Sequence, residues 1–238
     1  MKKVIQRVRG KIHNDIYARI DELKNTSYND IYQQAVKNEK EKRRIEHDNI
    51  PRISLERKHF TNLKYLLDRY ELLTLMPKSA VCAEIGVANG NYSRDILYIT
   101  EPKKFHLIDA WISNRYNENL MENVMSVFSL QIQEGTVQIN RGLSTEVLER
   151  FENEYFDWVY LDTDHRYALT KAELLLCNEK VKRGGIISGH DFCMGNWVNG
   201  YKYGVIEAVD EFCVTNNWEI IYITSEIENP SFALRRLK

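Results

Sequence analysis

The stretch AVCAEIGVANG, residues 80–90, decides the fold of this chain. It opens with an apolar run that is typical of a buried β-strand, and it ends in a turn with glycine at positions 86 and 90. A stretch with helical character then starts near Ser93. Dinucleotide sites need GxGxxG, with the pyrophosphate on the helix N-terminus, but the position two after Gly86 is Ala88. The turn therefore predicts that the backbone closely approaches a small ligand without a pyrophosphate.

Six further apolar runs follow this stretch, and most of them are separated by segments with helical character. This alternation is the pattern of a parallel sheet with crossover helices. The last two runs have only a short polar connection, which indicates an antiparallel hairpin at one edge. We therefore predict an α/β fold with a seven-stranded, mostly parallel sheet. The six runs are 104–111, 136–142, 156–162, 184–191, 218–224 and 231–237, and helices are expected at 93–99, 144–151 and 167–180.

The residues before this pattern are expected to form a helical extension. The segment KNEKEKRRIEH, residues 37–47, carries charges of both signs at helical spacing, which favours a solvated helix. Residues 55–75 place apolar side chains at helical spacing before Pro77, so we expect a second helix with one face on a core. We therefore divide the chain into a helical N-terminal extension, residues 1–78, and a main domain, residues 79–238.

The composition excludes several functional classes. The chain of 238 residues has 33 Lys and Arg against 34 Asp and Glu, a net charge of -1. Binding to a nucleic-acid backbone normally needs a basic excess, so no nucleic-acid partner is expected. No run of about 18 apolar residues is present, and no apolar segment follows the basic start, so we expect no membrane span, no signal peptide and a cytoplasmic location. The cysteines form no CxxC pair and are expected to be packed, reduced thiols: Cys82, Cys177, Cys193 and Cys213.

Acidic residues lie at the ends of the first two strands of the main domain. Asp109 ends the second of them, at the position where a carboxylate in such folds accepts hydrogen bonds from a ribose diol. Glu84, in the first strand, disfavours a phosphate and favours a cationic or amine-bearing ligand. Together the two carboxylates predict a nucleoside ligand that carries no phosphate.

The residues from 80 to 237 resemble the class I S-adenosylmethionine-dependent methyltransferases. The first motif of these proteins has the form E-x-G-x-x-x-G, which matches Glu84, Gly86 and Gly90, and an acidic ribose ligand follows one strand later, as Asp109 does here. The resemblance implies a Rossmann-like methyltransferase fold with S-adenosyl-L-methionine as the cofactor.

The resemblance also implies a place for each residue of the cofactor site. The two glycines would frame the methionine part, with Glu84 near its amino group and Ser93 within reach of its carboxylate. Asp109 would hold the ribose. Ser144 would lie near the adenine, although a role as the N-cap of the following helix explains it equally well. The implied cofactor-binding residues are Glu84, Gly86, Val87, Gly90, Ser93, Asp109, Ala110, Trp111, Ser144 and Asp162.

A second group of ionisable residues follows the fourth and fifth predicted strands, in the segments LDTDH (161–165) and SGHD (188–191). Ligands of open α/β sheets bind outside the carboxyl ends of the strands, so these two segments are expected to meet beside the cofactor. Asp164 is expected to cap the helix that starts near Tyr167. The residues predicted to gather are Asp162, His165, His190 and Asp191.

These segments, together with FDWVYLD, KRGGIISGHDF and GVIEAVDEF, are similar to a subfamily that includes the macrolide-sugar O-methyltransferases and the so-called cephalosporin hydroxylases. This resemblance implies a divalent metal, magnesium or manganese, between Asp162, His190 and Asp191. His190 stands where the subfamily has a carboxylate, and imidazole suits zinc, iron, manganese or nickel better than magnesium. The resemblance also implies that His165 is the general base, since the ordinary histidine pKa of about 6.5 suits removal of a hydroxyl proton.

We therefore predict a metal-assisted O-methyltransferase that acts on a hydroxyl of a sugar or glycan-type acceptor. The loop FCMGNWVNGYKYG, residues 192–204, is expected to fold over the cleft, where its aromatic side chains either stack on a sugar or anchor the loop. Three alternatives stay open: a catechol-like small-molecule O-methyltransferase, a hydroxylase-type enzyme of the same fold, and a non-catalytic cofactor-binding protein. The N-terminal helices are expected either to cover the cofactor or to mediate a homo-oligomer.

Overall fold

The computed structural model describes residues 28–196, 198 and 200–237, which belong to two compact units. The first unit ends at Glu46 and the second starts at His47. Residues 28–48 are helical, as the charged segment 37–47 predicts, and oppositely charged side chains in this helix pair at three- and four-residue spacing. The prediction for residues 1–27 lies outside the described residues. No helix among the described residues is both long and apolar enough to cross a bilayer.

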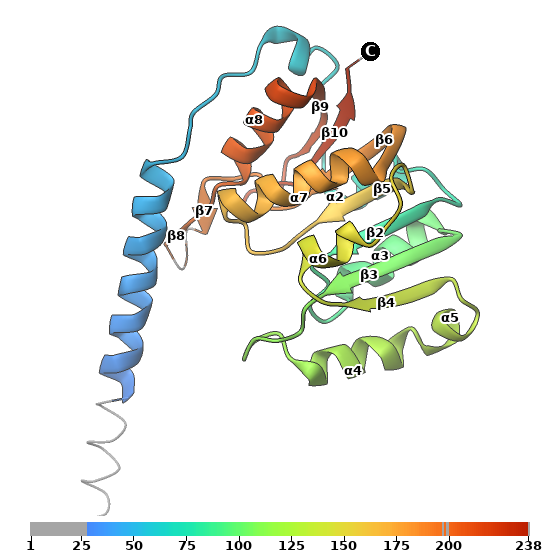
Figure 1. Cartoon of the computed structure of the whole chain (residues 1–238), viewed down its shortest axis with the longest axis horizontal. Helices are drawn as coiled ribbons and strands as arrows, with labels where there is room; N and C mark the ends of the chain where they lie inside the picture. The colour runs from blue at the N-terminus through green and yellow to red at the C-terminus, as the bar shows by residue number, and fades with distance from the viewer. Residues whose placement is uncertain (1–27, 197, 199, 238) are drawn as a thin grey trace, which may run out of the picture. The chain divides into compact units, whose positions relative to one another are not determined.

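An eight-stranded sheet runs through the second unit, in the order β1-β9-β10-β6-β5-β2-β3-β4 (Figure 1). All seven predicted strands are confirmed, and β1 is an additional strand. The strands are β1 (Lys64–Leu66), β2 (Val81–Ile85), β3 (Lys104–Asp109), β4 (Val137–Arg141), β5 (Phe156–Leu161), β6 (Val181–Gly189), β9 (Trp218–Thr224) and β10 (Phe232–Arg236).

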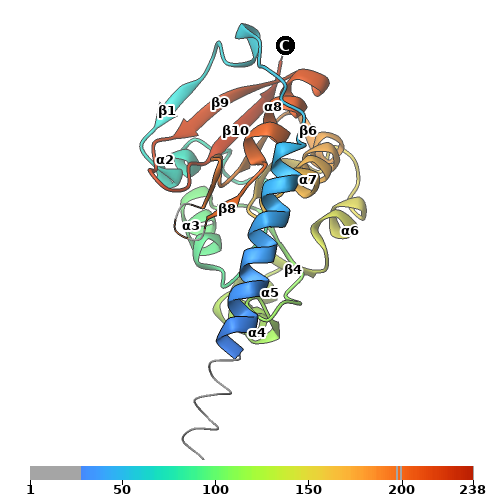
Figure 2. The ribbon, with the colours of Figure 1, turned by 90° about the vertical axis from the view of Figure 1, so that its left-hand side faces the viewer.

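The sheet is mostly parallel. Strand β10 pairs antiparallel with both β6 and β9, and the other pairs of this sheet are parallel. The predicted hairpin of the last two strands is thus confirmed. It does not form the outer edge, because β1 pairs with the far side of β9, as Figure 2 shows.

Helices cover both faces of the sheet and make an α/β/α arrangement. One apolar core joins the sheet to α6, α7 and α8 through Leu148, Leu174 and Phe212, and these helices lie in front of the sheet in Figure 1. A second core on the opposite face contains Leu73 of α2 and Ile96 of α3. The helices are η1 (Arg57–His59), α2 (Arg69–Thr74), α3 (Asn91–Thr100), α4 (Glu118–Val127), α5 (Ser129–Gln133), α6 (Ser144–Glu149), α7 (Tyr167–Lys180) and α8 (Val205–Asn216), and a small hairpin consists of β7 (Gly195–Asn196) and β8 (Tyr201–Lys202).

The segment 55–75 is not the single helix that its apolar spacing predicts. It contains η1, strand β1 and the short helix α2. Asp68 ends the extended segment, because its carboxylate accepts hydrogen bonds from the N–H groups of Tyr70 and Glu71 and so caps α2. Leu67, one of the apolar residues at the helical spacing, is exposed instead of packed on a core. Strand β1 and helix α2 belong to the second unit, which begins well before the boundary expected between residues 78 and 79.

Candidate functional site

The glycine turn after β2 packs directly against the end of β5. Gly86 has a φ of 94°, and a Cβ atom there would lie 1.8 Å from the carbonyl oxygen of Asp162. Its N–H donates to the carbonyl of Ile108, on the other neighbouring strand, at 2.8 Å. Gly90 has a φ of 75° and is the N-cap of α3. Gly86 must therefore be glycine for both its conformation and its close approach to the protein's own backbone.

Glu84 lies beneath this turn as a buried acid. Its side chain is almost fully buried, and it accepts a hydrogen bond from the hydroxyl of Ser93, which is itself fully buried in the first turn of α3. Burial raises the pKa of Glu84 well above its ordinary value, and the neighbouring Asp162 raises it further. In this structure the hydroxyl of Ser93 is therefore engaged by Glu84.

Asp109 shapes the turn through both of its carboxylate oxygens. Oδ2 accepts hydrogen bonds from the N–H groups of Val87 and Ala88, each at 2.9 Å, and Oδ1 accepts one from the N–H of Trp111 at 2.9 Å. The indole N–H of Trp111 closes the ring of contacts by donating to the carbonyl of Ala88 at 2.9 Å. Asp109 and Ala110 stay partly exposed, whereas Val87 and Trp111 are buried. The predicted ribose ligand is thus also the residue that holds the turn in place.

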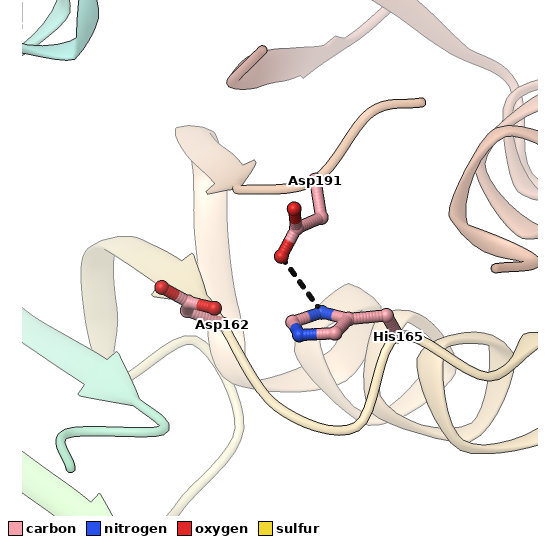
Figure 3. A group of neighbouring side chains, drawn as sticks. All are labelled: Asp162, His165 and Asp191. Carbon is pink, nitrogen blue, oxygen red and sulfur yellow. Dashed lines mark ion pairs between the residues drawn. The ribbon is translucent and has the colours of Figure 1, made fainter. Parts of the chain in front are cut away.

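Three ionisable side chains converge where β5 and β6 end (Figure 3). Nδ1 of His165 lies 3.1 Å from Oδ2 of Asp191, and one donor atom each of Asp162, His165 and Asp191 lie within 4.8 Å of one another. His165 and Asp191 both have positive φ values, 61° and 56°. Such backbone strain in non-glycine residues is typical of functional sites, where the surrounding fold holds it.

His190 completes the group that the strand ends predict. Its Nδ1 lies 3.5 Å from Oδ2 of Asp191 and 3.6 Å from Oδ2 of Asp162. Burial alone would lower the pKa of His190, but the two carboxylates more than offset burial and raise it. Burial also acts to raise the pKa of Asp191, and its partners His190 and His165 more than reverse this, so that the pKa is lowered. For Asp162 burial prevails, and its pKa is raised.

The structure brings together three side chains that could bind a metal ion, and one of them differs from the expected ligands. The expected ligands are Asp162, His190 and Asp191, whereas the three whose donor atoms meet are Asp162, His165 and Asp191. Two carboxylates and one imidazole fit manganese, iron or zinc better than magnesium. The chemistry of these side chains is therefore compatible with a divalent cation, which would compete with a base role for His165.

Glu173 is an ionisable residue that the sequence analysis missed. It lies on α7 with 1% of its surface exposed, beside a small cavity that His165 and His190 also line. Burial raises its pKa from 4.5 to about 7, against the hydrogen bonds from Ser144 and Thr163 that lower it, and Oε1 of Glu173 has no hydrogen-bond partner. The sequence signal that could have revealed Glu173 is its position as an acidic residue within the largely apolar stretch KAELLLC.

Neither the cap expected at Asp164 nor the cap offered as one alternative for Ser144 is found. Helix α6 begins at Ser144 itself, its N-cap is Leu143, and the hydroxyl of Ser144 bonds to Glu173 instead. Helix α7 has Arg166 as its N-cap without a side-chain capping bond, and Asp164 pairs with Arg166 at 3.1 Å. Ser144 thus contacts a group behind the site.

The loop 192–204 contains the hairpin β7–β8 and approaches the ionisable group through one aromatic residue. The ring of Tyr203 is buried, with its centroid 4.8 Å from that of His165. Trp197, an aromatic residue of this loop, and Asn199 lie outside the described residues. The four cysteines are free thiols, and three of them are buried, as expected: Cys82, Cys177 and Cys213.

Comparisons with known proteins relate the central part of the chain to a methyltransferase family. Residues 83–192 match the model of a family described as a methyltransferase domain. No curated protein has a significant match to the sequence. Many solved structures share the fold, and the three described next do so at low sequence identity, so they inform the fold alone.

The first is the pyocyanin biosynthetic protein PhzM, with a TM-score of 0.55 and 13% identity over 72% of this chain and 55% of that chain. The second, from Clostridium thermocellum, is assigned as an rRNA methylase and has a TM-score of 0.55 and 12% identity over 71% of this chain and 94% of the other. The third is the methyltransferase CalH in complex with SAH, with a TM-score of 0.53 and 13% identity over 71% and 55%. This chain thus spans about half the length of PhzM and CalH. The family match and the fold together support the prediction of an S-adenosylmethionine-dependent methyltransferase.

Proposed function

We propose that this methyltransferase domain transfers the methyl group of S-adenosyl-L-methionine to a hydroxyl of a sugar or sugar-like acceptor, with His165 as the general base. The observation that carries the proposal is the pair of His165 and Asp191, joined at 3.1 Å beside Asp162. The backbone of Asp162 is also the backbone that Gly86 packs against. The base and the cofactor turn are thus anchored on one strand end.

The pairing with Asp191 prepares His165 to accept a proton. The carboxylate of Asp191 is buried with a lowered pKa, so it stays ionised, and its Oδ2 lies 3.1 Å from Nδ1 of His165, within ion-pair distance. A proton on Nδ1 would face this carboxylate, which leaves Nε2 to take the proton of the acceptor. The other ring nitrogen in Figure 3 lies on the side that faces Asp162. A hydroxyl between Nε2 and the cofactor would lose its proton as its oxygen attacks the methyl group.

The acidic residues of the strand ends suit a cofactor that carries positive charge. Asp109 and Asp162 are partly exposed beside the turn, so their carboxyl oxygens can meet a ligand with a sulfonium, an amine or a diol, whereas Glu84 is buried beneath it. The cofactor supplies an activated methyl group when it is bound. Asp109 keeps lone pairs free for a ribose, since each oxygen of a carboxylate accepts more than one hydrogen bond.

For a divalent cation, we assign the carboxylates of Asp162 and Asp191 as the protein ligands. A bound cation would lower the pKa of the acceptor hydroxyl, so that the base could remove its proton more readily. His190, the expected third ligand, lies close to both carboxylates and has a raised pKa. We therefore assign it the role of positioning the side chains of Asp162 and Asp191. His165 then remains available as the base.

Turnover and cofactor binding test this proposal separately. With a panel of glycosides and S-adenosyl-L-methionine, the wild-type chain should release S-adenosylhomocysteine, measured by mass spectrometry. His165→Ala should lower kcat at least tenfold and leave the calorimetric affinity for S-adenosylhomocysteine nearly unchanged, because only proton removal is affected. The matched control Asp164→Asn changes an exposed carboxylate one residue away and should keep full turnover.

Three outcomes would contradict the proposal. Full turnover in His165→Ala would exclude a base role. An equal loss of turnover and cofactor affinity would show a structural histidine. A rate that falls to zero without oxygen would favour the hydroxylase-type alternative, since methyl transfer needs no oxidant.

A further inference from the structure

Arg69 is a cation that the mechanism above does not use. It is the first residue of α2, outside the residues that match the methyltransferase family, and Asp68 directly before it caps the helix. Glu71 strengthens this cap by accepting the N–H of Leu67 at 2.6 Å. The backbone of Arg69 is therefore held in the capped first turn of α2.

The guanidinium group lies over an aromatic platform. Its carbon is 4.6 Å from the centroid of the Tyr92 ring, and the Tyr92 ring is 4.7 Å from that of Tyr160. Both tyrosines are buried, and the hydroxyl of Tyr160 bonds to Ser231 at 2.9 Å. Stacking of this kind fixes the plane of a guanidinium group and leaves its N–H donors at the edge.

The donors of Arg69 are largely unused. Among the residues that the structure describes, its ionic partner is Glu226, whose Oε1 lies 4.0 Å from Nε, at the limit of an ion pair, and no hydrogen bond joins the two. The side chain of Arg69 is 28% exposed, so a ligand can reach it. A partly buried, stacked guanidinium with free donors is a typical receptor for a carboxylate, which it binds with two parallel hydrogen bonds.

Several contacts place this cation at the methionine end of the cofactor turn. Tyr92, under the guanidinium, is in the first turn of α3, two residues after the Gly90 cap, and the next residue, Ser93, contacts Glu84. The positive charge of Arg69 also acts on Glu84 and Asp162, where it opposes the burial that raises the pKa of each carboxyl group. Arg69 therefore interacts electrostatically with two carboxyl groups next to the turn, those of Glu84 and Asp162.

We propose that Arg69 binds the carboxylate of the methionine part of the cofactor. The assignment rests on the proposed use of S-adenosyl-L-methionine. It makes α2, which lies before the matched family region, part of the cofactor site. Ser93, the residue expected from the sequence to reach this carboxylate, is buried against Glu84, which leaves the role open for a cation.

Two nucleosides that differ only in the amino-acid part give a direct test. S-adenosylhomocysteine carries the carboxylate, whereas 5′-methylthioadenosine lacks it. By calorimetry on the full chain, Arg69→Met should weaken S-adenosylhomocysteine at least tenfold and change the affinity for 5′-methylthioadenosine less than twofold. Methionine keeps an unbranched apolar stem over Tyr92, and Arg69→Lys, which keeps the charge, should recover part of the lost affinity. The control Lys78→Met removes an exposed cation that pairs with Glu101 and should change neither affinity.

The outcomes separate this proposal from the function on which it rests. An unchanged affinity of Arg69→Met for S-adenosylhomocysteine would overturn the role of Arg69. An equal loss for both nucleosides would overturn it as well, because a structural role does not distinguish them. Wild-type chain that binds neither nucleoside would overturn the proposed function itself.

Discussion

Glu173→Gln should remove a pH dependence of stability that the buried carboxyl group imposes. In the folded chain burial raises the pKa of Glu173 from 4.5 to about 7, and in the unfolded chain it returns to the ordinary value. The folded state therefore binds more protons between these two values. Stability contributed by Glu173 is complete below pH 4.5 and falls as the pH rises toward 7.

The size of this loss follows from the two pKa values. Each pKa unit is worth about 1.4 kcal/mol, so between pH 5 and pH 8 the wild-type chain should lose about 2.5 kcal/mol through this residue. Glutamine is neutral at every pH and has nearly the same shape. The free energy of unfolding of Glu173→Gln, relative to wild type, should therefore rise by about that amount from pH 5 to pH 8.

Urea unfolding of the full chain at pH 5, 6, 7 and 8, followed by circular dichroism, measures this difference. Comparing the two proteins at each pH cancels the other titrating groups and the fixed packing cost of the amide. The control Glu134→Gln changes an exposed carboxyl group and should give a constant difference. A constant difference for Glu173→Gln as well, or a difference that falls with pH, would refute the inference that Glu173 is buried with a raised pKa.

Three further substitutions test other parts of the site. Gly86→Ala should lower the free energy of unfolding, measured by thermal unfolding, by at least about 3 kcal/mol, because its Cβ would lie 1.8 Å from a backbone oxygen. The control Gly135→Ala has a similar φ of 78° but open space around it, so it should cost only about 1 kcal/mol. Equal costs would contradict the close approach. Asp68→Ala should lower the free energy of unfolding by about 1 kcal/mol through loss of the α2 cap, and an unchanged urea midpoint would argue against that cap. Asp191→Asn should lower kcat at least tenfold with little change in S-adenosylhomocysteine affinity, because His165 would lose the carboxylate that orients it; turnover at the wild-type rate would exclude that role.

The positions of seven strands along the sequence could be predicted because their apolar runs are long enough to be distinct. Strand β1 was missed for a physical reason: Lys64 and Tyr65 are exposed, and only Leu66 is buried, so three residues carry no alternating pattern. Its extended conformation comes from pairing with β9, a partner far away in the sequence. The capping carboxylate of Asp68 was the local signal that a helix begins only after it.

The candidate site was predictable in its location and not in its details. Parallel strand ends meet at one edge of a sheet, so the juxtaposition of Asp162, His165, His190 and Asp191 followed from their positions in the sequence. Which imidazole faces which carboxylate depends on the positive φ values of His165 and Asp191, which no sequence pattern announces.

Buried or stacked ionisable residues were beyond the reach of the sequence. Glu173 sits in an apolar helical run and Arg69 in a segment that looks like a continuous amphipathic helix. Only the fold shows that the first lies behind the site, with its pKa raised by burial, and that the second stacks on a tyrosine of α3.

Calorimetric titration of the wild-type chain with S-adenosylhomocysteine tests the methyltransferase assignment most directly. We expect one molecule to bind per chain, S-adenosyl-L-methionine to compete for the same site, and NAD to bind far more weakly, because the turn around Gly86 lacks the GxGxxG spacing of a pyrophosphate site. The absence of binding heat with S-adenosylhomocysteine, or equal affinity for NAD, would contradict the assignment.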